Sequence, residues 1–209
     1  SDSPLLLEVE RAEGVYLLGS NGEKHFDLIS GVSVSNVGHS HPIVVEAVKQ
    51  QVDKYMHLMV YGEFIENPQV QFAAKLVSIL PETLNSVYFL NSGSEAIEGA
   101  MKLAKRFTGR TEIISFKNAY HGSTQGALSI MGSETFKRAF RPLLPDVQHL
   151  EFNNTAELDK ITSKTACVIA EPIQGEAGII AANREFLSKL RDQCSKVGAD
   201  RKSTRLNSS

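Results

Sequence analysis

From about residue 87 onward, short apolar runs alternate with longer segments whose apolar side chains recur at helical spacing. Gly109 and Gly198 follow two of the helical segments, where a left-handed residue commonly ends a helix. Strands that alternate with helices pack as helices on both faces of a mostly parallel sheet. The pattern therefore predicts an α/β fold with α/β/α layers. The strands are expected at residues 87–90, 112–116 and 166–170, and the helices at residues 94–107 and 184–197.

The first 80 residues follow a different plan. Residues 15–18 and 24–28 flank the turn Gly19-Ser20-Asn21-Gly22, which predicts a β-hairpin. Pro42 and Pro68 each stand at the first turn of a segment with an apolar stripe, which predicts two helices packed on a core. We expect residues 1–60 to form an N-terminal segment of hairpin plus helix, and residues 61–199 to begin a larger domain.

The last ten residues depart from this pattern. Gly198-Ala199 should lead into another buried strand, yet residues 200–209 are polar and basic, with neither helical nor strand periodicity. Such a segment is either a basic interaction tail or a foreign junction, and junctions are excluded before the fold is considered. We predict that residues 200–209 are a non-native tail.

Composition excludes several classes of function. The 209 residues carry a net charge of −2, which gives no electrostatic footprint for nucleic acid or an anionic membrane. No apolar stretch approaches the ~20 residues of a membrane span, and no secretory leader begins the chain. Cys167 and Cys194 lie in apolar patterns that indicate core packing rather than disulfides. We therefore expect a cytoplasmic protein.

The segment Phe89-Leu90-Asn91-Ser92-Gly93-Ser94-Glu95-Ala96 combines a strand end, a turn of small residues and a helix start. Unpaired N–H groups and partial positive charge at a helix start favour a phosphate group. Gly93 would let a phosphate approach the backbone, and Ser92 and Ser94 offer hydroxyls. A capping box of Ser92 and Glu95 explains the same residues without a ligand. The dinucleotide fingerprint, the Walker loop and the nucleophile elbow are all absent from this turn.

Four motifs stand in order along the chain. They are Val37-Gly38-His39-Ser40-His41-Pro42, the turn around Gly93, Phe116-Lys117-Asn118-Ala119-Tyr120-His121-Gly122, and Glu171-Pro172-Ile173-Gln174-Gly175-Glu176-Ala177-Gly178. With these motifs the sequence resembles class III aminotransferases, which depend on pyridoxal phosphate. The resemblance covers residues 4–199 and is strongest to ornithine and acetylornithine aminotransferases. It implies a fold-type-I transferase, truncated here within the large domain.

The resemblance implies roles for individual residues at a cofactor site. Ser92, Gly93 and Ser94 match the turn that binds the cofactor phosphate. Tyr120 matches the aromatic residue that stacks on the pyridine ring, although alone it reads as a core aromatic. His121 belongs to the same motif and either packs beside the ring or satisfies backbone groups. Glu171 matches a carboxylate near the cofactor, with a rigid surface carboxylate as the alternative.

Two further positions concern the substrate. In ornithine-type members the glutamate that matches Glu176 pairs with a later arginine, and opening that pair uncovers a charge for the substrate. An exposed loop glutamate is the alternative. Those members also carry an arginine after the aromatic-x-glycine, where this chain has Ser123. This departure leaves the amino donor open. The pair His39 and His41 is too small a set to predict a metal site.

Transamination also requires a lysine that bonds to the cofactor and an aspartate that keeps its pyridine nitrogen protonated. Neither motif occurs in this chain, so no catalytic residue is assigned and the chain alone is predicted to be inactive. The resemblance implies that the parent enzyme is a homodimer that moves an amino group from an amino acid or ω-amine donor to a 2-oxo acid, within amino-acid metabolism. An aminomutase or decarboxylase of the same fold, or a non-catalytic module that binds a phosphate ligand, are the alternatives.

Overall fold

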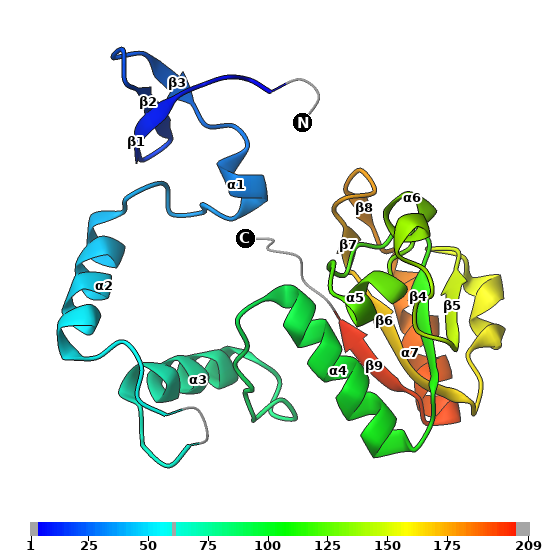
Figure 1. Cartoon of the computed structure of the whole chain (residues 1–209). Coiled ribbons are helices and arrows are strands. Elements are labelled where there is room, and N and C mark those ends of the chain that lie inside the picture. The colour runs from blue at the N-terminus through cyan, green and yellow to red at the C-terminus, as the bar shows by residue number, and fades with distance from the viewer. Residues whose placement is uncertain (1–3, 60–61, 204–209) are drawn as a thin grey trace. The chain divides into compact units, whose positions relative to one another are not determined.

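The computed structural model describes residues 4–59 and 62–203 of the chain (Figure 1). These residues form two compact units, which meet in sequence between Tyr88 and Phe89. The sequence places the start of the larger domain at residue 61, earlier than the start of the second compact unit. The domain boundaries therefore stay a prediction, and each unit is described by itself.

The second unit is built on a parallel sheet of four strands. Their order is β5-β4-β6-β9, and each neighbouring pair runs parallel, as the alternation of strands and helices predicts. Cys167 of the central strand β6 pairs with Ile113 on one side and with Asp200 on the other. The strands are β4 (Glu112–Phe116), β5 (Val147–Leu150), β6 (Thr165–Ala170) and β9 (Asp200–Ser203).

Helices cover both faces of this sheet because alternate residues of each strand point to opposite sides. Helix α4 (Gly93–Thr108) packs on one face, and α7 (Arg184–Val197) packs on the other. The predicted α/β/α layers are confirmed. The α4 face buries Ile97, Met101, Ala104, Ile113, Cys167 and Ile169, and the α7 face buries Ile114, Phe116, Val168, Phe186, Leu190 and Cys194.

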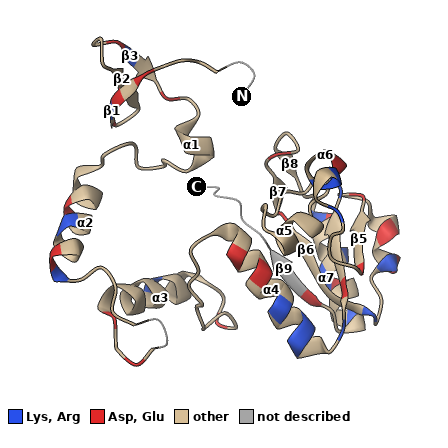
Figure 2. Ribbon diagram, viewed as in Figure 1, with Lys and Arg blue, Asp and Glu red and all other residues tan. Residues whose placement is uncertain are grey.

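The ends of α4 and α7 are fixed by their own sequence. Ser92 and Asn183 are N-caps whose side-chain oxygens accept hydrogen bonds from N–H groups of the first turn. Gly109 (φ +69°) and Gly198 (φ +68°) are left-handed C-caps, as predicted. Acidic residues lie at the start of α4 and basic residues at its end, which complements the helix dipole (Figure 2).

Short elements complete the second unit. No helix among the described residues is both long enough and apolar enough to cross a bilayer. The two cysteines are buried, one in each core, as the sequence predicts. The short elements are α5 (Gln125–Ser129), α6 (Glu134–Lys137), the 3₁₀ turns η1 (Arg138–Phe140) and η2 (Thr155–Lys160), and the hairpin strands β7 (Ile173–Gln174) and β8 (Ile180–Ala181).

The first unit contains an antiparallel sheet of order β1-β2-β3, of which the predicted hairpin forms two strands. The predicted helices at Pro42 and Asn67 are present. Within the described residues neither helix has a buried residue, so their apolar stripes do not face a core of their own unit, contrary to expectation. The elements are β1 (Val9–Glu13), β2 (Tyr16–Gly19), β3 (Lys24–Phe26), the left-handed turn α1 (Ser30–Ser33), α2 (Pro42–Lys54) and α3 (Asn67–Ile79).

Two local predictions are wrong. Residues 87–90 form no strand, because an apolar run becomes a strand only where a neighbour takes its backbone hydrogen bonds, and the described sheet offers none there. Asp200–Ser203 form β9 although the side-chain pattern predicts no strand, because backbone pairing with β6 suffices at a sheet edge. Residues 204–209 of the predicted tail lie outside the described residues.

Candidate functional site

The turn that begins α4 is closed by the side chains of Ser92 and Glu95, in a variant of the capping box in which the glutamate binds the N–H of the residue before the N-cap. Ser92 Oγ accepts a hydrogen bond from the Glu95 N–H (3.2 Å), and Glu95 Oε2 accepts one from the Asn91 N–H (2.7 Å). The Gly93 and Ser94 N–H groups lie at the very start of the helix, where no helical carbonyl precedes them. A Cβ built on Gly93 would meet no atom of the described residues within 4 Å. The turn therefore presents donors beside open space.

The segment that carries Tyr120 lies directly against this turn. Ser94 Oγ accepts a hydrogen bond from the Ser123 N–H (3.3 Å). Gly122 has φ +122°, and a Cβ there would lie 2.1 Å from Ser94 Oγ and 3.0 Å from Ser94 Cα. Only glycine allows both that backbone conformation and that approach. The structure thus brings together the Gly93 and Tyr120 motifs, which stand almost 30 residues apart in the chain.

Backbone atoms also hold the beginning of this segment. Asn118 has φ +61°, and Gly132 donates its N–H to the Ala119 carbonyl oxygen (2.9 Å). A Cβ on Gly132 would lie 2.2 Å from Asn118 N, 2.4 Å from Phe116 O and 2.5 Å from Ala119 N. The sequence does not predict a special role for Gly132. Its contact is with a turn elsewhere in the chain, and no motif or periodicity at Gly132 itself indicates that contact.

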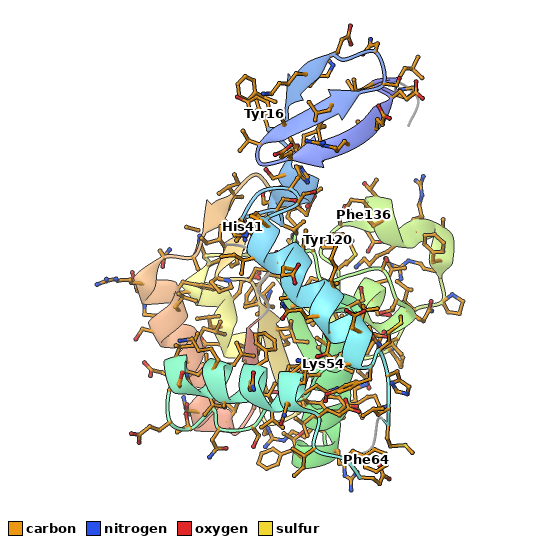
Figure 3. All side chains as sticks on the ribbon, turned by 90° about the vertical axis from the view of Figure 1, so that its left-hand side faces the viewer. Tyr16, His41, Lys54, Phe64, Tyr120 and Phe136 are labelled. Atoms are coloured by element: carbon orange, nitrogen blue, oxygen red, sulfur yellow. The ribbon has the colours of Figure 1, made fainter. Side chains whose placement is uncertain are left out.

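Tyr120 is held at both its backbone and its ring. Its N–H donates to Glu171 Oε2 (3.1 Å), which links the segment after β4 to the end of β6. Its ring lies edge-on to Phe136 of α6, with ring centroids 6.3 Å apart and an interplanar angle of 84° (Figure 3). Edge-to-face pairs of this kind are favourable and orient both rings. Tyr120 is therefore a fixed, partly accessible aromatic surface.

Glu171 is the most perturbed acid of the site. It is 1% exposed, and its Oε1 has no hydrogen-bond partner among the described residues. Burial raises the pKa of Glu171 to about 7, while the N–H groups of Tyr120 and Gly175 favour the charged form and Glu176 opposes it. A buried carboxyl oxygen without a partner is unusual, and its hydrogen-bonding capacity is unused in the described residues.

His121 points toward the sheet. Its Nε2 lies 3.0 Å from Ser115 Oγ of β4, and the side chain is buried. Burial, and to a smaller extent the charge of His149, lowers the pKa of His121 to about 4, so the ring is neutral near pH 7. This contact anchors the motif to β4. A contact between His121 and a cofactor ring stays a prediction.

The other residues considered from the sequence are Glu176 and Lys117 of this unit and His39 of the first unit. Glu176 is exposed in the turn between β7 and β8. Lys117 is exposed and forms an ion pair with Glu151, which raises the pKa of the lysine. In the first unit, the His39 ring lies 2.6 Å from Asp27 Oδ2, and this contact is the first cause of the lowered pKa of Asp27.

Sequence relatives support a single family. The chain is 41% identical over 187 residues to an acetylornithine aminotransferase of Methanopyrus kandleri, which covers 89% of the chain and 48% of the relative. It is 40% identical over 193 residues to a LysW-aminoadipate semialdehyde/glutamate semialdehyde transaminase of Sulfurisphaera tokodaii, covering 92% of the chain and 49% of the relative. The chain thus spans about half the length of the curated relatives it matches.

A solved structure agrees with these relatives. The adenosylmethionine-8-amino-7-oxononanoate aminotransferase of Methanocaldococcus jannaschii superposes with a TM-score of 0.91 at 32% identity, over 99% of this chain and 50% of that one. The family profile described as Aminotransferase class-III matches residues 1–199. The motif order, the parallel sheet with helices on both faces, and these matches lead to one assignment. The chain belongs to the class-III aminotransferase family.

Proposed function

We propose that the full-length protein is an aminotransferase that moves an amino group from an amino acid or ω-amine donor to a 2-oxo acid, with pyridoxal 5'-phosphate as cofactor. Family membership supports this proposal, and the relatives reported above are named as amine-transferring enzymes. The observation that carries it is the joining of the α4 start to the Tyr120 segment through Ser94 and Gly122. We further propose a cytoplasmic homodimer.

The α4 start would hold the cofactor phosphate. The N–H groups of Gly93 and Ser94 would donate to phosphate oxygens, and the positive end of the helix would favour their charge. The Ser94 hydroxyl accepts from Ser123 and retains its own O–H as a donor. Ser92 uses its oxygen as the helix cap and likewise retains an O–H. The open space at Gly93 is where a Cβ would obstruct the phosphate.

Tyr120 would set the plane of the cofactor ring, and Glu171 would carry or accept a proton beside it. When bound, the cofactor ring draws electrons from the carbon that carries the transferred amine. Tyr120 would lie against one face of that ring, oriented by Phe136. Glu171, with its pKa near 7, would hold or accept a proton at Oε1 while Oε2 keeps Tyr120 in place. His121 supports the same segment from β4, and Glu176 would reach the substrate from the hairpin turn.

The reaction is tested on the full-length protein loaded with pyridoxal 5'-phosphate. Ornithine, N-acetylornithine and simple ω-amines are supplied with 2-oxoglutarate, and glutamate formation is measured. Glutamate should form with at least one donor. A protein that binds the cofactor but forms no glutamate with any of these donors would contradict the proposal and favour another enzyme of this fold.

The phosphate site is tested with Gly93→Ala. The added methyl meets nothing within 4 Å in the protein alone, and alanine favours a helix, so the apoprotein should be at least as stable as wild type. The same methyl would obstruct the phosphate, and the loss of one such contact corresponds to about a tenfold weaker cofactor affinity. Cofactor titration by absorbance measures this. Unchanged affinity would place the phosphate elsewhere.

A further inference from the structure

Glu98 joins α4 to the segment that follows Tyr120. It lies one helical turn after Ser94, on the same side of α4. Its Oε1 accepts hydrogen bonds from Thr124 Oγ1 (2.7 Å), the Gly126 N–H (2.7 Å) and the Ala127 N–H (3.1 Å). One carboxylate oxygen therefore takes three donors from a segment more than 25 residues away.

These donors belong to the start of α5. Thr124 is the N-cap of α5, and its side chain makes no capping bond to that helix. Glu98 supplies the missing acceptor from another helix, and a carboxylate is well suited to the positive end of a helix. Hydrogen bonds to a charged acceptor are stronger than those between neutral groups. The start of α5 is thus fixed by α4 rather than by its own sequence.

Gly126 is shaped for this contact. A Cβ built there would lie 2.2 Å from Glu98 Oε2 and 2.7 Å from both Cδ and Oε1, and these are the three nearest atoms. A side chain at position 126 would displace the carboxylate from its donors. A substitution at position 126 should therefore break the hydrogen bonds of Glu98 while Glu98 itself is unchanged.

Ser94 and Glu98 together bind consecutive parts of one segment. Ser94 accepts from Ser123, and Glu98 accepts from Thr124 onward, so residues 122–127 run along the first two turns of α4. Tyr120 lies two residues before Gly122, where the contact between this segment and α4 begins. We propose that Glu98 is a positioning residue that fixes the distance between the Tyr120 ring and the phosphate-binding start of α4. This inference rests on the proposed function.

The test uses the full-length protein with Glu98→Ala, Gly126→Ala and the double variant. Each single variant should accelerate release of pyridoxal 5'-phosphate about tenfold, the effect expected when a few charge-assisted hydrogen bonds are lost. The double variant should release it no faster than either single variant, because both remove the same contact. Glu98→Gln keeps an oxygen acceptor and should recover much of the wild-type rate. Release is followed by cofactor absorbance after dilution into a trap.

Amide hydrogen exchange of the apoprotein provides a readout that does not depend on the cofactor. Residues 120–127 should exchange about tenfold faster in Glu98→Ala, with the sheet strands unchanged. Glu185→Ala is the matched control, since Glu185 is an exposed helix glutamate that pairs only with Lys189 among the contacts described. The inference is overturned by wild-type exchange at residues 120–127, or by effects that add in the double variant. If wild type binds no cofactor, the proposed function fails while the exchange experiment still decides the role of Glu98.

Discussion

Two loops leave the carboxyl ends of the neighbouring strands β4 and β6, and both contain glycines of the family motifs. In the segment after β4, a Cβ on Gly122 would overlap Ser94, one on Gly126 would overlap the Glu98 carboxylate, and one on Gly132 would overlap the backbone at Asn118. In the hairpin after β6, a Cβ on Gly175 or Gly178 would meet nothing within 4 Å. Glycines of the first loop are therefore closely packed, whereas the second loop is held mainly by its own short hairpin.

The difference matches the tasks proposed for the two loops. An aromatic ring that sets the plane of a cofactor must be positioned closely, because misplacement by about 1 Å can cost 10²-fold in rate. A carboxylate that pairs with a movable partner, as proposed for Glu176, gains from an exposed and adaptable turn. Alanine substitutions at glycines in the two loops measure how much stability each loop loses when a methyl group is added.

Gly132→Ala should have the largest effect. Its Cβ would overlap three backbone atoms, none further than 2.5 Å, and backbone cannot rotate away as a side chain can. We expect a loss of more than about 4 kcal/mol in the free energy of unfolding, which is enough to prevent folding of most domains. Soluble yield and circular dichroism measure this.

Gly99→Ala is the control for Gly132→Ala. Gly99 lies within helix α4, and the added methyl would make an ordinary contact with Leu90 Cδ1 at 3.5 Å. Because alanine is favoured over glycine in a helix, this variant should gain about 0.5–1 kcal/mol. A Gly132→Ala protein as stable as the control would contradict the tight packing of the first loop.

Gly122→Ala should follow, with a loss of about 3–4 kcal/mol. Part of this cost is the left-handed backbone, and part is the approach to Ser94 Oγ at 2.1 Å. The loss should shrink in a Ser94→Gly background, because the nearest overlapping atoms are then absent. Urea unfolding of the full-length apoprotein measures both. A cost that is equal in both backgrounds would mean that backbone strain alone matters.

Glu171 links the two loops and predicts a pH dependence. Its pKa is raised from 4.5 to about 7 in the folded protein, so the folded state binds a proton that the unfolded chain releases. Stability from this group is full below pH 4.5 and is lost as pH rises to about 7, by roughly 3 kcal/mol. Glu171→Gln should lack this loss and so gain on wild type between pH 5 and pH 8. Thermal unfolding of the apoprotein across this range measures the difference, and parallel pH curves would contradict it.

Much of the frame of this site could be predicted from sequence. Residues within one turn of each helix end determine the bounds of α7. Residues in the same positions also determine the caps of both α7 and α4. The strands β4 and β6 follow from runs that are apolar on both faces. These features depend on near neighbours in the chain, which the sequence displays directly.

The contacts that join the motifs could not be predicted in the same way. Glu98 reads as an ordinary surface position of an amphipathic helix, and nothing near it in sequence indicates α5. Gly126 and Gly132 have no turn or cap signal of their own. Glycine is required at these positions by contacts with segments that are distant in the chain, and loop positions of this kind depend on tertiary contacts rather than local propensity.

Gly175→Ala should have the smallest effect and so completes the contrast. The φ angle of Gly175 is one that other residues adopt, and the added methyl would lie in open space, so stability should change by less than about 0.5 kcal/mol. Gly178→Ala is the matched control in the same turn: its space is equally open, but its φ of +105° should cost about 1–2 kcal/mol. The difference between these two variants isolates backbone conformation from packing. If Gly175→Ala were as costly as Gly122→Ala, the hairpin would be packed as tightly as the first loop, and an adaptable role for Glu176 would lose its structural basis.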